Sequence, residues 1–272
     1  MAIDIDAYCA RIGYDGPRTP TLDTLRSLHR LQPQAIAFEN LDPLLGKPPS
    51  LDPAALFDKL IARNRGGYCY EQNLLLAEAL TALGFRFRYL TGWPRWRIAP
   101  GRVMPRTHLL FLVESDGEEW VADVGFGGNT MTAPLLLRSR QEQVTLHEPM
   151  RMIDKDCNRM IQAKIGGEWQ DLLEFNLDHQ TFAEIEMANW FSATHPTTRF
   201  TKELLLARTE PDRRYGLLDN VLTTHRRGQP STRRRLSSAG ELRDVITDLF
   251  LITPPDDAGL EPMLARIAEK AS

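Results

Sequence analysis

The chain has 272 residues, of which 42% are hydrophobic and 25% charged, and its formal net charge is −3 at pH 7. This ordinary globular composition supports one large or two to three small domains and needs no disulfide or metal to stabilise its core. The charge balance gives no reason to expect nucleic acid, and no apolar run approaches the ~18 residues of a membrane helix. The acidic start does not resemble a signal peptide, so we expect a cytoplasmic protein without membrane contact.

The cysteines, Cys9, Cys69 and Cys157, are odd in number and far apart, with no CxxC pair. We therefore expect neither a disulfide framework nor a thiolate zinc site, and no metal. Most free cysteines are small core hydrophobes, and this interpretation suits Cys9. It also serves for Cys157, whose neighbours indicate a turn, whereas Cys69 needs a separate argument.

The first 84 residues have helical periodicity. One helix is expected after a cap at Thr21, and a second begins where Asp52 caps a proline at the first helical position. The second helix is expected to stop at Gly66-Gly67, and a third runs from about Tyr68 to Gly84.

After Gly84 the apolar period becomes alternating, which is a strand signal. THLLFLVE and EEWVADVGF flank Ser115-Asp116-Gly117 and predict a hairpin, and more strands are expected in MRMI, MIQAKI and WQDLLEF. Residues 85–177 thus read as a mainly antiparallel sheet or barrel. A short helix is expected from Thr181 to about Phe191.

The last part of the chain mixes both structure types. YGLLDNVLTTHRR predicts a hairpin turning at Asp219-Asn220. A helix follows a capping box of Ser238 and Glu241, and a terminal helix begins near Leu260. Helices, then strands, then a mixed segment indicate an α+β chain.

Cys69 lies in RGGYCYEQN, directly after two glycines and at the start of a predicted helix. Unpaired amides and partial positive charge at that end favour a thiolate. The glycines would also let a substrate approach the backbone closely. The alternative is a buried cysteine in a first helical turn, since a reactive thiol also needs a base.

His108 opens an apolar strand, where a lone histidine is more often a core residue. A two-residue turn at Asp116-Gly117 pairs residue 110 with 123 and 108 with 125, so His108 and Asp123 become diagonal neighbours on one face. A turn one residue earlier puts them directly opposite, and a three-residue loop would spoil this parity. An Asp–His bond orients the ring toward a third group, so we predict a triad of Cys69, His108 and Asp123.

Asp123 begins DVGFGG, which reads either as a tight turn or as a loop that presents amides to a phosphate or an acyl oxygen. RGGYCYEQN, THLLFLV, DVGFGG and FENLD together resemble the arylamine N-acetyltransferase family. The resemblance continues through FSATHPTTRF and RYGLLDNVLTTH and covers nearly the whole chain.

The resemblance implies a helical bundle at 1–84 with the nucleophile, a β-barrel at 85–180 with the histidine and aspartate, an interdomain helix at 181–202 and an α/β lid at 203–272. It implies acetyl-coenzyme A as co-substrate, no permanently bound cofactor, and small arylamines or arylhydrazines as acceptors. The acetyl group would pass through an acetyl-cysteine in a ping-pong reaction.

The resemblance also suggests roles for further residues. Arg11, Glu39 and Arg65 would form a buried ion-pair network that supports the Cys69 loop. Phe38 and Phe126 would line an acceptor pocket or pack in the core. Three other groups complete the set: Thr107 and Gly127 at the coenzyme, the Tyr70 amide at an oxyanion, and the arginines at 226, 227 and 233–235 either in a solvated loop or at coenzyme phosphates.

Two other functions compete with this hypothesis. A cysteine hydrolase, either an amidase or a protease, would use the same triad, and the triad alone does not decide between the two enzymes. A binding module without activity would carry the three residues by coincidence. Selective alkylation of Cys69 over Cys9 and Cys157 separates the enzymes from the binding module.

Overall fold

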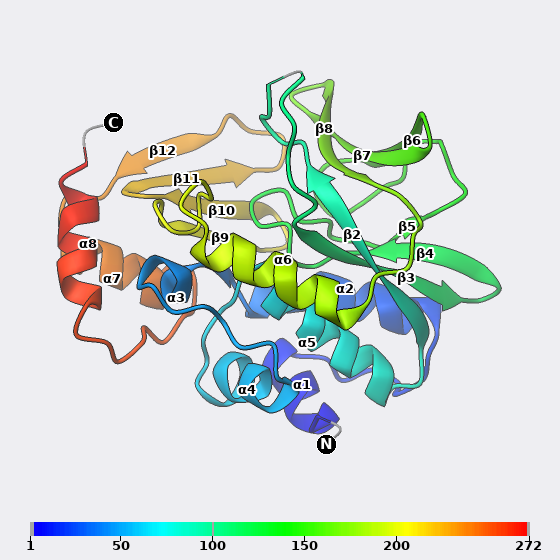
Figure 1. Ribbon diagram of the computed structural model, residues 1–272, viewed down its shortest axis with the longest axis horizontal. Helices are drawn as coiled ribbons and strands as arrows, with labels where there is room; N and C mark the ends of the chain where they lie inside the picture. Colours follow the sequence, from blue (N-terminus) through cyan, green and yellow to red (C-terminus); the bar gives the residue numbers. More distant parts are fainter. Residues whose placement is uncertain (1–2, 100, 271–272) are drawn as a thin grey trace.

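The computed structural model describes residues 3–99 and 101–270. An N-terminal group of helices lies below a barrel on the right and a sheet with two helices on the left (Figure 1). The helical elements of the first part are α1 (Ile5–Ile12), α2 (Leu22–Ala35), α3 (Leu41–Leu44), α4 (Pro53–Phe57), the π-helical turn η1 (Asp58–Ala62) and α5 (Cys69–Ala82).

The predicted helix starts are confirmed, but one helix ends earlier than expected. Thr21 Oγ1 accepts from the amide of Thr24, and Asp52 Oδ1 accepts from the amides of Ala54 and Ala55. The helix that begins at Pro53 turns into η1 and ends at Ala62, not at Gly66-Gly67. The glycines are needed for another reason, because a Cβ on Gly66 would lie 2.3 Å from Ala37 O.

The first 84 residues are not purely helical, since β1 (Phe38–Glu39) is a strand. It pairs antiparallel with β9 in the C-terminal sheet, with Phe38 opposite Ala207. The segment before Cys69 is therefore paired with the last third of the chain. The proposed domain limits stay a prediction, and their outermost residues, 1–2 and 271–272, lie outside the described residues.

The barrel is an antiparallel sheet of seven strands in the order β5-β4-β3-β2-β8-β7-β6. It is nearly closed by Gln143, whose backbone pairs with Met150 of β6 while its side chain binds both main-chain groups of Leu136 in β5. The strands are β2 (Arg86–Pro94), β3 (His108–Ser115), β4 (Glu118–Ala122), β5 (Leu135–Leu136), β6 (Met150–Lys155), β7 (Asn158–Ile165) and β8 (Glu168–Phe175).

The β3–β4 hairpin has the predicted register. Ser115 lies opposite Glu118 and Phe111 opposite Ala122, so the even-numbered residues of β3 share a face with the odd-numbered residues of β4. Leu110 and Leu112 pack inside the barrel, whereas Leu109 and Phe111 pack against the helices. Both faces of β3 are buried, which explains its unbroken run of apolar residues.

The C-terminal part is a five-stranded antiparallel sheet in the order β1-β9-β10-β11-β12, covered by helices on its outer side (Figure 1). The hairpin at Asp219-Asn220 is confirmed by the pairing of Leu218 with Val221. The elements are α6 (Phe182–Thr194), β9 (Leu205–Thr209), β10 (Arg213–Leu218), β11 (Val221–Arg226), β12 (Thr232–Arg235), α7 (Ala239–Asp244), the π-helical turn η2 (Val245–Leu249) and α8 (Leu260–Ala268).

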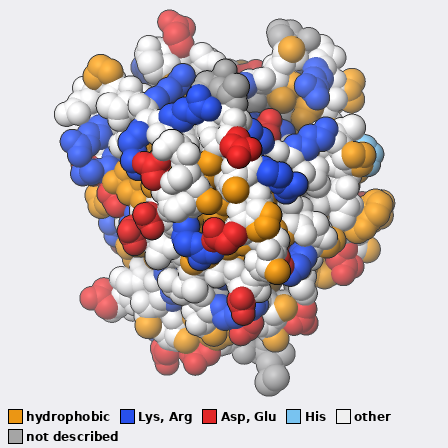
Figure 2. Space-filling view, turned by 90° about the vertical axis from the view of Figure 1, so that its left-hand side faces the viewer, with side chains coloured by type: hydrophobic (Ala, Val, Ile, Leu, Met, Phe, Trp, Pro, Cys, Tyr) orange, Lys and Arg blue, Asp and Glu red, His pale blue; other side chains and the backbone are white. Residues whose placement is uncertain are grey.

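Two expectations for minor elements were wrong. Residues 233–235 form the exposed edge strand β12 rather than a loop. Cys157 lies in the β6–β7 turn that its neighbours indicated, but it is exposed and not a core residue. Basic side chains on this side of the molecule are interspersed with acidic and hydrophobic ones (Figure 2). Across the described part of the chain, no helix is both long and apolar enough to cross a membrane.

The architecture is therefore α+β, with a helical bundle, a central antiparallel barrel and a C-terminal α/β part, as predicted. Each part has its own apolar cluster. The strand β3 contributes to two of these clusters, so the barrel and the helical bundle pack as neighbours.

Candidate active site

Cys69 is the first residue of α5 and is buried, with 3% of its surface exposed. Glu71 fixes this helix start, because its Oε2 accepts from the amide of Tyr68 at 3.0 Å. The helix is buried on nearly all sides, which holds its first turn in the interior rather than at the surface.

Two side chains of α5 bind the main chain on either side of His108. Tyr70 Oη donates to Thr107 O at 2.8 Å, and Asn73 Nδ2 donates to Leu109 O at 2.8 Å. The start of the helix is thus fastened to the first residues of β3. This brings Cys69 and His108 into one neighbourhood although 39 residues separate them in the sequence.

His108 and Asp123 form the predicted pair, with His108 Nε2 2.7 Å from Asp123 Oδ2. The other carboxylate oxygen accepts from Asn73 Nδ2 at 2.9 Å and from the amide of Gly125 at 2.8 Å. Burial alone would raise the pKa of Asp123, but His108 and these donors hold that pKa below its ordinary value. Since Nε2 faces the carboxylate, Nδ1 is the ring atom left for proton exchange.

Cys69 also touches the segment that follows the aspartate. A Cβ on Gly125 would lie 2.8 Å from Cys69 O and 2.9 Å from Cys69 Cα, so only glycine fits there. Cys69, His108 and Asp123 are therefore assembled where α5, β3 and the end of β4 meet.

The expected low thiol pKa is not a property of Cys69 alone. Burial and the charge of Asp123 raise the pKa of Cys69, while the amides of Tyr70 and of Cys69 itself lower it by less. The amides at the helix start thus lower the pKa of Cys69, as predicted, but burial and the charge of Asp123 raise it by more. An imidazolium at His108 is the partner that would stabilise the thiolate in this interior.

His29 was not recognised in the sequence as part of the site. It lies in α2, is fully buried, and its Nε2 accepts from the amide of Asp123 at 3.0 Å. A single histidine on a helical face 94 residues from its partner carries no local signal. Asn73 was also missed, although its position one helical turn after Cys69 was a usable hint.

Aromatic rings lie next to His108 and next to the residue before Cys69. Phe126 lies edge-on to the His108 ring, with centroids 5.2 Å apart. Phe38 lies 6.2 Å from Phe200, and Phe200 lies 5.3 Å from Tyr68, the residue before the nucleophile. Phe38 and Phe126 are only partly buried. Each of them also packs against a core cluster. Phe200, from THPTTRF, is an addition to the predicted aromatic residues.

The loop after Asp123 is held from the C-terminal sheet. The Gly127 amide donates to Thr130 Oγ1 at 3.0 Å, and Thr130 O accepts from Arg214 Nη1 of β10 at 2.9 Å. Arg214 is buried and also pairs with Glu148 at 2.8 Å. Thr107, the other residue suggested for the coenzyme, is half-buried and is held through its carbonyl by Tyr70.

A buried charge cluster supports the segment before Cys69. Arg65 Nη2 lies 2.7 Å from Glu39 Oε1, and Lys59 lies 2.6 Å from both Glu71 and Asp42. Lys59 was not foreseen, because its place in the sequence reads as an exposed lysine on a helix. Its two partners, Asp42 and Glu71, were missed with it.

Arg11 does not join this cluster as expected. Its guanidinium donates to Ala35 O at 2.8 Å and to Leu60 O at 3.3 Å, and no carboxylate of the described residues pairs with it. Arg11 thus connects α1 to the ends of α2 and η1 through main-chain oxygens. Lys59 takes the place in the ion-pair cluster that was expected for Arg11.

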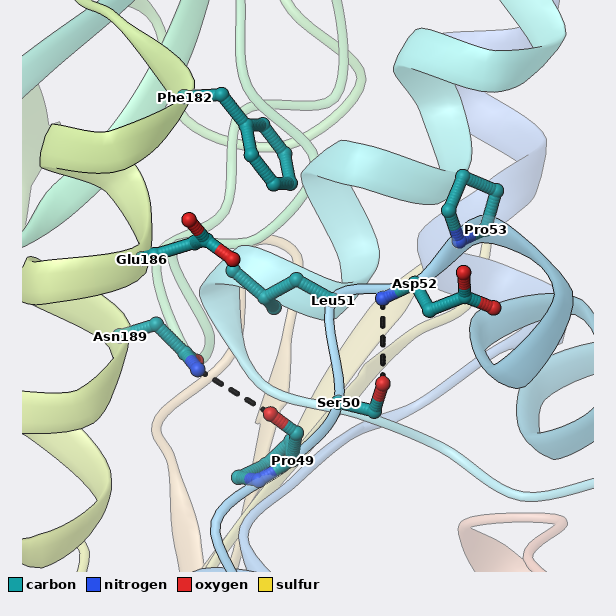
Figure 3. A pocket seen from close by; sticks show the side chains of 8 residues that line it. All are labelled: Pro49, Ser50, Leu51, Asp52, Pro53, Phe182, Glu186 and Asn189. Carbon is teal, nitrogen blue, oxygen red and sulfur yellow. Dashed lines mark hydrogen bonds between the residues drawn. The ribbon is translucent and has the colours of Figure 1, made fainter.

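A hollow of about 490 Å³ lies between α6 and the segment before α4 (Figure 3). Its lining contains none of Cys69, His108 and Asp123. Asn189 at its wall donates to Pro49 O at 3.2 Å and accepts from the hydroxyl of Tyr68. Asn189 thus supports Tyr68, the residue before Cys69. The residues that line the hollow are Pro49, Ser50, Leu51, Asp52, Pro53, Phe182, Glu186 and Asn189.

Within residues 3–99 and 101–270, no cluster of three or more His, Cys, Asp or Glu is arranged to hold a metal ion.

A buried thiol at a helix start, beside a histidine–carboxylate pair, is the arrangement of enzymes that transfer acyl groups through a cysteine. A family model described as N-acetyltransferase matches residues 21–256. The chain is 39% identical to the arylamine N-acetyltransferase of Mycobacterium tuberculosis (strain ATCC 25618 / H37Rv), over 99% of this chain and 96% of that protein.

Solved structures agree with the sequence comparison. The arylamine N-acetyltransferase of M. smegmatis matches with a TM-score of 0.94 at 37% identity, over 99% of this chain and 100% of that one. The Mycobacterium marinum enzyme in complex with CoA matches with a TM-score of 0.93 at 39% identity, over 97% and 99%. The chain belongs to the arylamine N-acetyltransferase family, as its sequence motifs suggested.

Proposed function

We propose that the protein transfers the acetyl group of acetyl-coenzyme A to an arylamine or arylhydrazine by a ping-pong mechanism, with Cys69 as the acetylated residue. The single observation that carries the mechanism is the 2.7 Å bond between His108 and Asp123 beside the start of α5. It fixes the ring so that Nδ1 is directed to a third group.

In the first half-reaction, His108 Nδ1 takes the proton of the Cys69 thiol. The thiolate attacks the thioester carbonyl, and the amides of Cys69 and Tyr70 donate to the developing oxyanion. The intermediate collapses with cleavage of the carbon–sulfur bond of the coenzyme. The departing thiolate takes the proton back from His108, which leaves coenzyme A and an acetyl-cysteine.

In the second half-reaction, the nitrogen of the acceptor attacks the acetyl-cysteine carbonyl. His108 removes a proton from that nitrogen, and the Cys69 thiolate leaves and is protonated again. The rings of Phe38, Phe126 and Phe200 would orient a flat acceptor and keep water away from the thioester. Thr107 and the Gly127 loop are the groups we propose for contact with the coenzyme.

Intact-mass analysis after mixing with acetyl-coenzyme A, without acceptor, tests the first half-reaction. We expect one acetyl group on the wild type and on a Cys9→Ser/Cys157→Ser double variant, and none on Cys69→Ala. Acetylation of Cys69→Ala at the wild-type level would refute the assignment.

The decay of the acetyl-enzyme separates a transferase from a cysteine hydrolase. It is followed in buffer, with an aliphatic amine, and with an arylhydrazine. The aryl nucleophile should discharge it much faster, because its nitrogen is largely unprotonated at neutral pH and the aromatic residues position its ring. Equal decay in all three would identify water as the acceptor and the protein as a hydrolase.

A further inference from the structure

The amide of Asp123 is the first of its strand to leave the barrel ladder, because the last β3–β4 pair is Phe111 with Ala122. In the buried interior an amide without a partner costs free energy. His29 Nε2 supplies the acceptor at 3.0 Å, from a helix outside the barrel. A side chain of α2 therefore holds the main chain of Asp123, the residue that carries the carboxylate.

This bond determines the tautomer of His29. A ring nitrogen that accepts from an amide carries no proton, so the proton of the neutral ring is on Nδ1. Nδ1 has no hydrogen-bond partner among the described residues. Burial lowers the pKa of His29 to about 4, although the charge of Asp123 acts to raise it, so the ring is neutral at physiological pH.

The Asp123 side chain is fixed at other points. Asn73 and the Gly125 amide bind Oδ1, which leaves Oδ2 for His108. A carboxylate can still swing about its Cα–Cβ bond if the backbone behind it shifts. The bond from His29 restrains such a shift of the backbone at Asp123 itself, while Asn73 Oδ1 accepts from the next amide, that of Val124, at 3.0 Å.

We propose that His29 is a positioning residue of the triad: its neutral Nδ1–H form holds the main chain of Asp123 so that the carboxylate meets His108 Nε2. This rests on the proposed catalytic role of Asp123. It makes the helical bundle a part of the catalytic machinery through α2 as well as through α5.

The reach of the side chain offers a matched pair of variants. In His29→Gln, the amide oxygen lies as many bonds from Cα as Nε2 does and can accept from the Asp123 amide. In His29→Asn, the same amide group stops one bond short. Both variants are uncharged and polar, so they differ mainly in reach, while His29→Leu removes the acceptor altogether.

The test measures two rates on each purified full-length variant, together with thermal unfolding. One is the single-turnover acetylation of the protein by acetyl-coenzyme A, and the other is the pH profile of Cys69 alkylation by iodoacetamide. We expect His29→Gln to stay within about threefold of the wild type, since one hydrogen bond of similar reach is kept. His29→Asn and His29→Leu should lose about ten- to a hundredfold in both rates, as expected for a misplaced catalytic group.

The pH profile adds a readout that lost stability alone would not change. With Asp123 loosened, the His108 imidazolium loses support, so thiolate formation in His29→Asn should shift to higher pH while His29→Gln keeps the wild-type profile. Equal rates and profiles in all folded variants would overturn the proposal. So would equal damage in the Gln and Asn variants. If the wild type gains no acetyl mass, the proposed function fails, and alkylation of Cys69 still decides the role of His29.

Discussion

The two carboxylate oxygens of Asp123 have different partners, and this makes the residue sensitive to a very small change. Oδ1 is occupied by two N–H donors, from Asn73 and Gly125, while Oδ2 alone faces His108. A carboxylate accepts on both sides. An amide in the same place must put its oxygen toward the two donors and its NH₂ group toward the histidine.

Asp123→Asn should therefore leave the protein folded but reverse the bond to His108. An NH₂ group facing Nε2 forces the histidine proton onto Nδ1, and a protonated Nδ1 cannot take the proton of Cys69. We expect single-turnover acetylation to fall by about two to four orders of magnitude, the upper value being that of serine triads. A thermal unfolding curve should show a cooperative transition, and wild-type acetylation by the folded variant would remove Asp123 from the triad.

The neutral state of His29 also affects stability at low pH. The ordinary pKa of histidine is 6.5, and burial lowers that of His29 to about 4. Below pH 6.5 the unfolded chain takes up a proton that the native state refuses, so stability falls as the pH drops and rises with pH across this window. Below about pH 4 both states are protonated and the loss ends.

We expect the wild type to lose about 3 kcal/mol more unfolding free energy than His29→Gln between pH 7 and pH 4, from a difference of about 2.5 pKa units. Urea denaturation at several pH values measures this difference. Asp123, whose folded pKa is lowered, also loses stabilisation at acid pH, but it does so in both proteins and largely cancels. Parallel curves would show that His29 is protonated in the native protein.

At the scale of elements, the contacts between η1 and α5 fix the position of the helix start that carries Cys69. Lys59 is buried in the π-helical turn η1, where it reaches Glu71 of α5 and Asp42 of α3. Glu71 in turn caps α5 through the Tyr68 amide. A single buried lysine thus connects three elements directly before Cys69.

Lys59→Met should destabilise the protein by about 3–5 kcal/mol, because it leaves buried carboxylates without their cation. Lys47→Met is the matched control, since Lys47 pairs with Asp257 at the exposed surface and its loss should cost less than about 1 kcal/mol. Unfolding free energies from urea titrations compare the two. A similar small effect in both variants would mean that the buried cluster contributes little net stability.

Local patterns made part of this structure predictable. The β3–β4 register followed from the Asp116-Gly117 turn and from alternation, which act within about ten residues. The pairing of Phe38 with Ala207 could not be read in this way, because 169 residues separate them and a two-residue strand has no periodicity. The π-helical turn was missed because five residues are too few to distinguish the apolar period of a π-helix from that of an α-helix. The pairing of His108 with Asp123 was predictable from the hairpin register, whereas the residues that hold this segment, His29 and Arg214, are single residues from distant segments.

At the scale of the whole molecule, the segment from Asp123 to Thr130 is where the three parts meet. The helical bundle holds its first residue through His29, and the C-terminal sheet holds its last through Arg214. Arg214 uses two sides of its guanidinium, with Nη1 on Thr130 O and Nε on Glu148 Oε2 at 3.0 Å. The C-terminal sheet therefore supports the loop that follows Asp123.

Arg214→Lys should disturb this support without removing the charge. A single ammonium cannot reproduce the fork that reaches both Thr130 O and Glu148, so the turn that binds the Gly127 amide loses its anchor. We expect the unfolding free energy to fall by about 1–3 kcal/mol and single-turnover acetylation to fall about tenfold. Arg213→Lys is the control, because its side chain lies on the same strand but pairs with Asp212 at the surface and should cost under about 0.5 kcal/mol. Equal effects of the two substitutions on acetylation would show that the C-terminal sheet does not position the loop, and that the site depends on the helical bundle and the barrel alone.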